Sequence, residues 1–214
     1  MTRANDKLMS QLRDLPMVRV DKEYVFHAPG GKDVTLVGLF GDKKQLIIYH
    51  FMFGPDADSG CRGCSHFVEN LPDTRHIGSK NTAFAAVSRA PIEKIEAFKN
   101  ITGWKVPWVS SGGSDFNYDF HVTLDDSVTP VEYNYMDKEE LEERGWPTAG
   151  EHPGMSVFYK DGDQVYHTYS TYTRGLDRFL NTFALLDITP LGRQVGASGP
   201  AEFKRSHEYD EEKK

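Results

Sequence analysis

The strongest signal in the pattern of hydrophobic and polar positions is the run QLIIYHFMF over residues 45–53. An apolar run without alternation is typical of a central strand covered on both faces, as in a parallel α/β sheet. A second run, TAFAAVS over residues 82–88, predicts another buried strand, and residues 104–109 predict a third. Between the second and third runs, Pro91 and apolar residues at three-residue spacing predict a helix that ends at Gly103.

Shorter elements are predicted around this core. They are a helix over 6–14, strands over 24–27 and 34–40, a hairpin of strands over 155–159 and 165–171, and an amphipathic helix after Thr173. The pattern weakens over residues 111–154, which we interpret as an insertion or lid with a charged helix over 137–144. The polar stretch 196–214 is predicted to be a disordered tail that follows a single domain over 1–195.

The chain has two cysteines, both in the sequence GCRGCSH over residues 60–66. They follow the run 45–53 and begin a predicted helix over 61–71. Spacing of i and i+3 at a helix start places both thiols on one face, and the free N–H groups there favour a thiolate. Arg62 adds a positive charge. The pattern predicts a dithiol–disulfide pair in which Cys61 is the nucleophile and Cys64 the resolving thiol.

Composition narrows the class of protein. The 214 residues are 38% hydrophobic, which indicates a globular core, and a formal net charge of −7 argues against nonspecific nucleic-acid binding. We find no apolar run long enough to span a membrane and no apolar segment of a secretory signal at the start. These features predict a cytoplasmic protein, in which two cysteines indicate redox or metal chemistry rather than a structural disulfide.

Other interpretations of these residues stay open. Zinc could bind to Cys61, Cys64 and His66, with His50 as a fourth ligand, although no second pair of ligands is present. The cysteines could also be free thiols without turnover. His66 could carry protons or simply be exposed on a helix. Arg89, after a buried strand, could bind an anion, steady the thiolate or form a salt bridge.

Aromatic residues are concentrated in and around the insertion. They could line a groove for a peptide or an aromatic ligand, or form the core beneath the lid, which is the interpretation we favour. They are Trp104, Trp108, Phe116, Tyr118, Phe120, Tyr133, Tyr135 and Trp146.

Several blocks of the sequence resemble the DUF899 family of bacterial thioredoxin-like proteins over residues 24–193. The blocks are YHFMFGPD, GCRGCS, AVSRAP, GWKVPWVSS, SDFNYDF, SVFY and HTYSTYTRGLD. The resemblance implies an α/β thioredoxin-like fold, with a mixed central sheet flanked by helices, an N-terminal extension and an inserted segment. It also implies that Cys61 and Cys64 are the redox pair, and it specifies no substrate.

The sequence departs from thioredoxins around this pair. Thioredoxins carry Trp before the first cysteine and Gly-Pro between the two, whereas Gly60 precedes the pair here and Arg62-Gly63 separates it. Pro153 is the candidate for the cis-proline that thioredoxins place opposite the pair. Pro55 and Ser59 fall one residue short of the peroxiredoxin spacing before a reactive cysteine.

We therefore predict a thiol–disulfide oxidoreductase that needs no bound cofactor. It would act on a protein or small-molecule disulfide and receive electrons from an external thiol reductant. The alternatives are a non-enzymatic ligand-binding or redox-sensing module of thioredoxin fold and, less favoured, a peroxide reductase.

Overall fold

A mixed sheet of eight strands forms the centre of the protein, in the order β1-β12-β11-β4-β5-β6-β2-β3. The computed structural model describes residues 2–211. The predicted apolar runs form the middle of the sheet, where β4 (Gln45–His50), β5 (Thr82–Ser88) and β6 (Trp108–Ser110) are parallel. On its other side β4 pairs antiparallel with β11 (Gly154–Asp161). The two runs without alternation are therefore central strands, as predicted.

The strands toward both edges of the sheet pair in an antiparallel manner. On one side β11 forms a hairpin with β12 (Gln164–Tyr172), and β1 (Val18–Arg19) pairs with β12. On the other side β2 (Val25–Ala28) joins β6 to β3 (Lys32–Thr35).

The predicted strand over 34–40 is wrong beyond Thr35. The Thr35 hydroxyl accepts a hydrogen bond from the Gly38 N–H at 3.1 Å, which caps the short helix α2 (Leu36–Leu39) in place of a continued strand.

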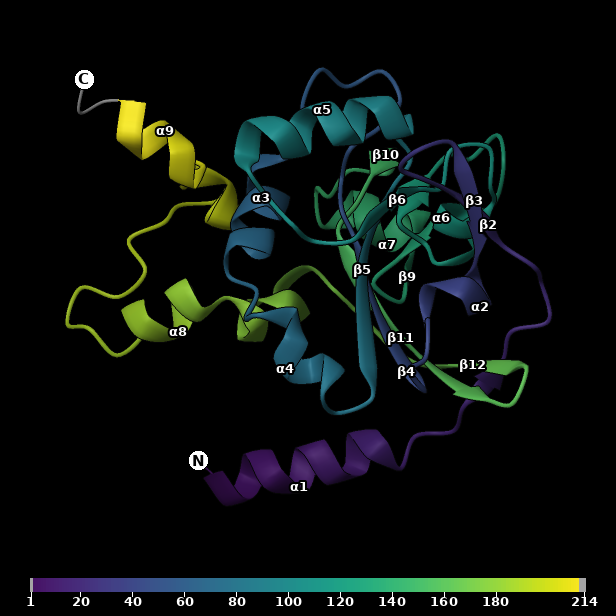
Figure 1. Cartoon of the computed structure of the whole chain (residues 1–214). Coiled ribbons are helices and arrows are strands. Elements are labelled where there is room, and N and C mark those ends of the chain that lie inside the picture. Colours follow the sequence, from purple (N-terminus) through teal and green to yellow (C-terminus); the bar gives the residue numbers. More distant parts are fainter. Residues whose placement is uncertain (1, 212–214) are drawn as a thin grey trace.

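Helices cover both faces of the sheet. Figure 1 shows α3 (Arg62–Glu69), α4 (Thr74–Gly78) and α8 (Asn181–Leu186) on one side of the central strands, with α2 and α6 (Phe116–Asp119) on the other. The helix α5 (Ile92–Thr102) belongs to the first side, because its Ile95 and Phe98 share a core with Tyr49 and Phe67. Leu46 and Ile48 face the second core. Alternate residues of β4 thus serve two separate cores.

The N-terminal helix α1 (Thr2–Arg13) lies beside the rest of the chain and buries none of its residues (Figure 1). Within residues 2–211, no helix has the length and apolar composition needed to cross a membrane.

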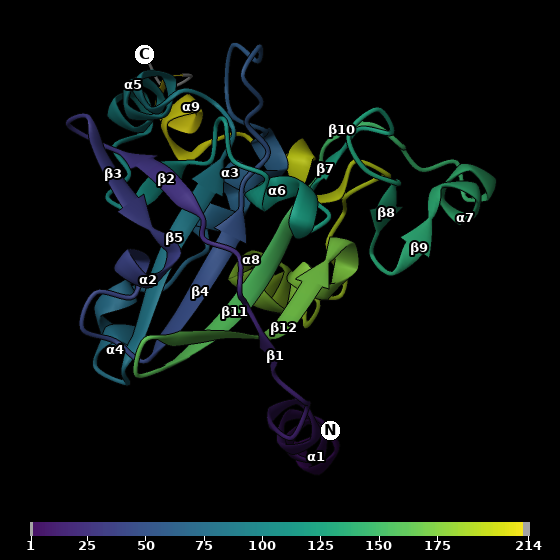
Figure 2. The same ribbon diagram turned by 90° about the vertical axis from the view of Figure 1, so that its right-hand side faces the viewer.

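The segment predicted as an insertion contains short elements around a small core of its own. Figure 2 shows β8 (Glu132–Tyr133), β9 (Met136–Asp137) and α7 (Lys138–Glu143) projecting to one side of the sheet. The strands β7 (Thr123–Leu124) and β10 (Gly150–Glu151) pair with each other. The rings of Phe116, Phe120 and Tyr133 are buried, as the core interpretation predicts, whereas Tyr135 and Trp146 are exposed.

The C-terminal part differs from the prediction in two ways. The amphipathic helix after Thr173 is divided at Leu180 into a 3-10 helix (Thr173–Phe179) and α8. The predicted disorder is wrong for residues 196–211, which contain a 3-10 helix (Gly199–Glu202) and α9 (Ser206–Glu211). Polar groups of this segment find partners on α3, since the Ser206 N–H donates to the Glu69 carboxylate at 3.0 Å. Residues 212–214 of the predicted tail lie outside the described residues.

Candidate redox site

The two cysteines lie where the central strand leads into α3. Cys61 is the N-cap residue of this helix, and its N–H donates to the Met52 carbonyl at 3.1 Å. Cys61 is partly exposed, whereas Cys64, in the first turn, is 1% exposed, and neither forms a disulfide. The pair therefore combines an accessible thiol with a buried one at the helix start, where the sequence places both.

The local structure favours the thiolate of Cys61. The neighbouring Cys64 thiol contributes most to lowering the pKa of Cys61 to about 6. The backbone N–H groups of Gly63 and Cys64 at the helix start add to the effect, as does the positive charge of Arg205, while burial opposes it. This lowered pKa favours the thiolate of Cys61 at neutral pH.

Cys64 has the opposite character. Burial, and then the neighbouring Cys61, raise its pKa well above the ordinary value. Two groups donate to its sulfur: the Tyr49 hydroxyl and the Met52 N–H, the latter at 3.4 Å. Sequence reasoning missed Tyr49, although its place in the strand before the pair was the available signal. Its ring is held by stacking on Phe67, with centroids 3.8 Å apart.

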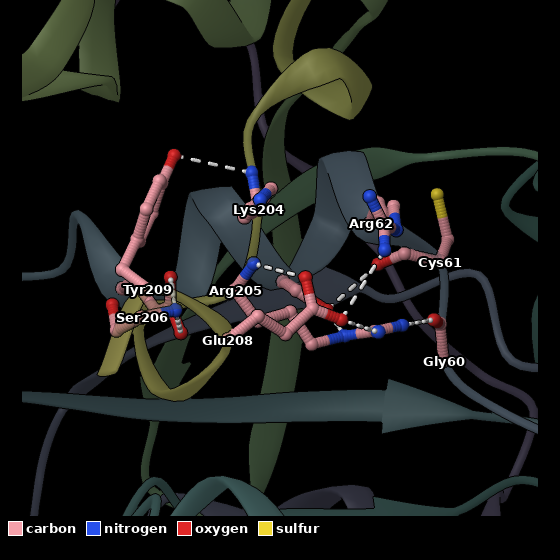
Figure 3. A network of polar contacts seen from close by, with 10 residues as sticks. Gly60, Cys61, Arg62, Lys204, Arg205, Ser206, Glu208 and Tyr209 are labelled. Atoms are coloured by element: carbon pink, nitrogen blue, oxygen red, sulfur yellow. Dashed lines mark hydrogen bonds and ion pairs between the residues drawn. The ribbon is translucent and has the colours of Figure 1, made fainter. Parts of the chain in front are cut away.

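An arginine from the C-terminal segment is built into the site (Figure 3). Arg205 Nη2 donates to the Gly60 carbonyl at 2.7 Å, and its Nε donates to Ser65 Oγ at 3.2 Å. The Ser65 hydroxyl in turn donates to the Cys61 carbonyl at 2.9 Å. Sequence reasoning assigned the supporting charge to Arg62, which pairs with Glu208 at 3.2 Å. Arg205 was missed because the segment that carries it was predicted to be disordered.

The substitution Arg205→Met is expected to raise the pKa of Cys61, because it removes the positive charge and keeps an unbranched apolar side chain. The rate of iodoacetamide alkylation at pH 6 should fall, whereas the rate at pH 9 should not change, since Cys61 is then a thiolate in both proteins. The control Arg178→Met alters an arginine that lies over Phe179. An equal decrease in both variants, or a decrease at both pH values, would contradict this assignment.

The other candidate residues have partners elsewhere in the structure. His66 is buried rather than exposed, because its ring stacks on Phe203 with centroids 4.3 Å apart, and burial lowers its pKa. Arg89 forms a salt bridge with Glu151 at 3.1 Å and lies over the Tyr118 ring.

Pro153 immediately precedes β11 and lines the same cavity as both cysteines. Its carbonyl accepts a hydrogen bond from the Tyr133 hydroxyl at 2.8 Å. No peptide bond in the described part of the chain is cis, so Pro153 lines the cavity with a trans bond and is not the cis-proline that the sequence suggested.

The zinc ligands suggested by the sequence do not assemble. Residues 2–211 contain no group of three or more His, Cys, Asp or Glu side chains arranged to hold a metal ion. His66 faces Phe203, and His50 bonds to Ser156 Oγ at 2.8 Å.

Gly60 is required by close packing before the pair. A Cβ at this position would lie 2.7 Å from Phe51 Cε1 and 2.9 Å from Phe98 Cε1, both in the core. We expect Gly60→Ala to destabilise the protein by about 1–3 kcal/mol in urea unfolding. Gly54→Ala is the matched control, because its Cβ would meet the nearest atom at 3.5 Å, and equal losses would refute the packing argument.

Comparisons with known structures identify the fold. The peroxidoxin BcpB from Mycobacterium tuberculosis aligns with a TM-score of 0.51 and 12% identity, covering 78% of this chain and 93% of that one. A bacterioferritin comigratory protein from Xanthomonas campestris aligns with a TM-score of 0.46 and 17% identity, covering 78% and 91%. The first likeness shows the fold alone, and the predicted thioredoxin-like fold is confirmed.

No protein with a curated description matches the sequence. A family model does, over residues 1–209, and its description reads "Bacterial protein of unknown function (DUF899)". Since the match covers nearly the whole chain, the protein belongs to the DUF899 family.

Proposed function

We propose that the protein is a thiol–disulfide oxidoreductase that uses Cys61 and Cys64. The observation that carries the proposal is the contrast between the two thiols. Cys61 is accessible at a helix start with a pKa of about 6, and the buried thiol of Cys64 beside it contributes most to that lowered pKa. One thiolate is thus ready to attack, with a second thiol in position to resolve the product.

The reaction would proceed in two exchanges. The Cys61 thiolate attacks one sulfur of a substrate disulfide, so that a mixed disulfide forms and the first substrate thiol leaves. Cys64 loses its proton and attacks the Cys61 sulfur, which releases the second substrate thiol and leaves a Cys61–Cys64 disulfide. An external thiol reductant would return the pair to the dithiol. No bound cofactor takes part in these steps.

Support for a redox role also comes from the fold, since the thioredoxin-like sheet presents the pair at the carboxyl end of β4. We further propose a cytoplasmic location, because a reducing compartment would keep the pair available as a dithiol.

The proposal is tested by trapping the first intermediate. Reduced Cys64→Ser protein, treated with 2,2′-dithiodipyridine or glutathione disulfide, is expected to gain the mass of one substrate thiol on Cys61, seen by mass spectrometry of its peptides. Wild-type protein should instead lose two hydrogens as the internal disulfide forms. The control Cys61→Ser should form an adduct far more slowly than Cys64→Ser does. If Cys61 reacts no faster than a free cysteine, the oxidoreductase function is refuted and a ligand-binding module is favoured.

A further inference from the structure

A cavity of about 520 Å³ opens beside both cysteines. This volume is within the range of sites for small molecules. The segment 193–201 contributes one wall, and the wider lining is mainly apolar. Its larger apolar side chains are those of Met52, Phe67, Leu176, Leu180, Phe183 and Val195. A molecule in this cavity would contact an apolar surface and the reactive sulfur together.

The charged groups around the cavity are paired with one another. Within residues 2–211, the charged side chains that line it are Arg174, Asp177 and Arg193. Arg193 contacts Asp177 at 2.6 Å and also Asp187 at 2.7 Å. Arg174 lies 3.7 Å from Asp177 with 90% of its side chain exposed, so its charge is in contact with solvent. A charged substrate group that left the solvent for the cavity would find Arg193 and Asp177 already paired with each other, whereas an apolar group would match the apolar lining.

The chain's own C-terminal segment covers one side of the helix that carries the pair. A Cβ on Gly63 would lie 3.6 Å from the Ala201 nitrogen and 3.7 Å from Pro200 Cγ. The bond from Arg205 to the Gly60 carbonyl, at 2.7 Å, fixes the same segment at the start of α3. A folded protein would have to displace these contacts to bring a disulfide to this side, and a small molecule would not.

We propose that the cavity selects small disulfides with apolar substituents, by binding one substituent while its sulfur meets Cys61. This inference rests on the oxidoreductase function proposed above. The Cys61 thiolate attacks R–S–S–R, the sulfur–sulfur bond breaks, and the first R–S⁻ leaves and takes a proton from water. Cys64 gives up its proton and displaces the second R–S⁻ from Cys61. Two electrons thus pass from the dithiol to the substrate, and an external dithiol restores the pair.

The test measures selectivity in single-turnover reactions of the full-length reduced protein. The probes are 2,2′-dithiodipyridine, bis(2-hydroxyethyl) disulfide and insulin. Each rate constant is divided by that of dithiothreitol with the same probe, which removes the intrinsic reactivity of the disulfide. We expect the normalised value for the dipyridyl probe to exceed the other two by at least about tenfold, the discrimination that one apolar pocket provides.

Two matched variants locate the selectivity. Ala197 is exposed and lines the cavity, so Ala197→Trp should obstruct the cavity without disturbing the core and lower the dipyridyl rate constant about tenfold or more. Ala184 is exposed on α8 and is not part of the lining, and Ala184→Trp should react like the wild type. The inert isostere 1,2-di(2-pyridyl)ethane should inhibit the wild type competitively and have no effect on Ala197→Trp.

The outcomes separate this inference from the function on which it rests. Equal normalised values for the three probes, or an unchanged rate in Ala197→Trp, would overturn the substrate class while exchange itself continues. If no probe reacts faster with the protein than with a free thiol, and Cys64→Ser traps no adduct, then both the substrate class and the oxidoreductase function are overturned.

Discussion

Replacing Cys61 by serine is expected to reduce disulfide turnover by about a thousandfold or more, since a hydroxyl does not ionise or attack sulfur at neutral pH. Replacing Cys64 by serine should slow turnover, because the mixed disulfide on Cys61 must then wait for attack by the external reductant, but should leave one rapid burst of released thiol per protein molecule. The difference follows from burial: Cys61 is accessible to a disulfide, and Cys64 is not. The measurement is release of 2-thiopyridone from 2,2′-dithiodipyridine, with dithiothreitol present for turnover and absent for the burst.

The pH dependence of the burst gives a second readout. In the wild-type protein the thiolate fraction of Cys61 increases as pH rises through its pKa of about 6, so the rate constant of the first thiol release, measured without reductant, should rise through this region and become constant above it. An ordinary thiol would continue to gain rate up to a pH of about 9. If Cys61→Ser released as large a burst as Cys64→Ser, the assignment of the attacking thiol to Cys61 would be wrong. A rate that still increases steeply above pH 8 would contradict the lowered pKa.

Local pattern was sufficient to predict the centre of this fold and the position of the thiol pair. The uninterrupted apolar runs have side chains to bury on both faces, which a strand achieves in the middle of a sheet covered on both sides. The position of Cys61 and Cys64 after such a run predicted that a helix begins at the pair. These features depend on residues close together in the sequence.

The groups that tune the pair are different, because they depend on contacts between distant segments. Arg205 lies far along the chain from Gly60, and its own surroundings are polar enough to predict disorder. The segment is ordered by what it meets, such as the stacking of Phe203 on His66 and the bond of Ser206 to Glu69. Composition alone cannot reveal partners that are supplied by another element.

Tyr49 lies where it can assist the resolving step by Cys64. Its ring is buried and stacked on Phe67, and its hydroxyl donates a hydrogen bond to the Cys64 sulfur. When Cys61 is held in a mixed disulfide, Cys64 must become a thiolate in an environment that disfavours charge. The Tyr49 hydroxyl and the Met52 N–H are the donors that would stabilise that thiolate. A hydrogen bond to a charged group contributes about 1.5–3 kcal/mol, more than one between neutral groups.

The substitution Tyr49→Phe is therefore expected to slow resolution about 10- to 100-fold while leaving the attack by Cys61 nearly unchanged. The ring and its stacking on Phe67 are kept, so the loss would come from the hydroxyl. Mixed disulfide should accumulate in quenched samples, and the pH at which resolution is half-maximal should rise, which a merely structural defect would not produce. Tyr24→Phe is the matched control, because that buried hydroxyl also donates to a charged group, Asp119, at 2.8 Å. Unchanged resolution in Tyr49→Phe, or an equal slowing in Tyr24→Phe, would show that the Tyr49 hydroxyl has no part in forming the Cys64 thiolate.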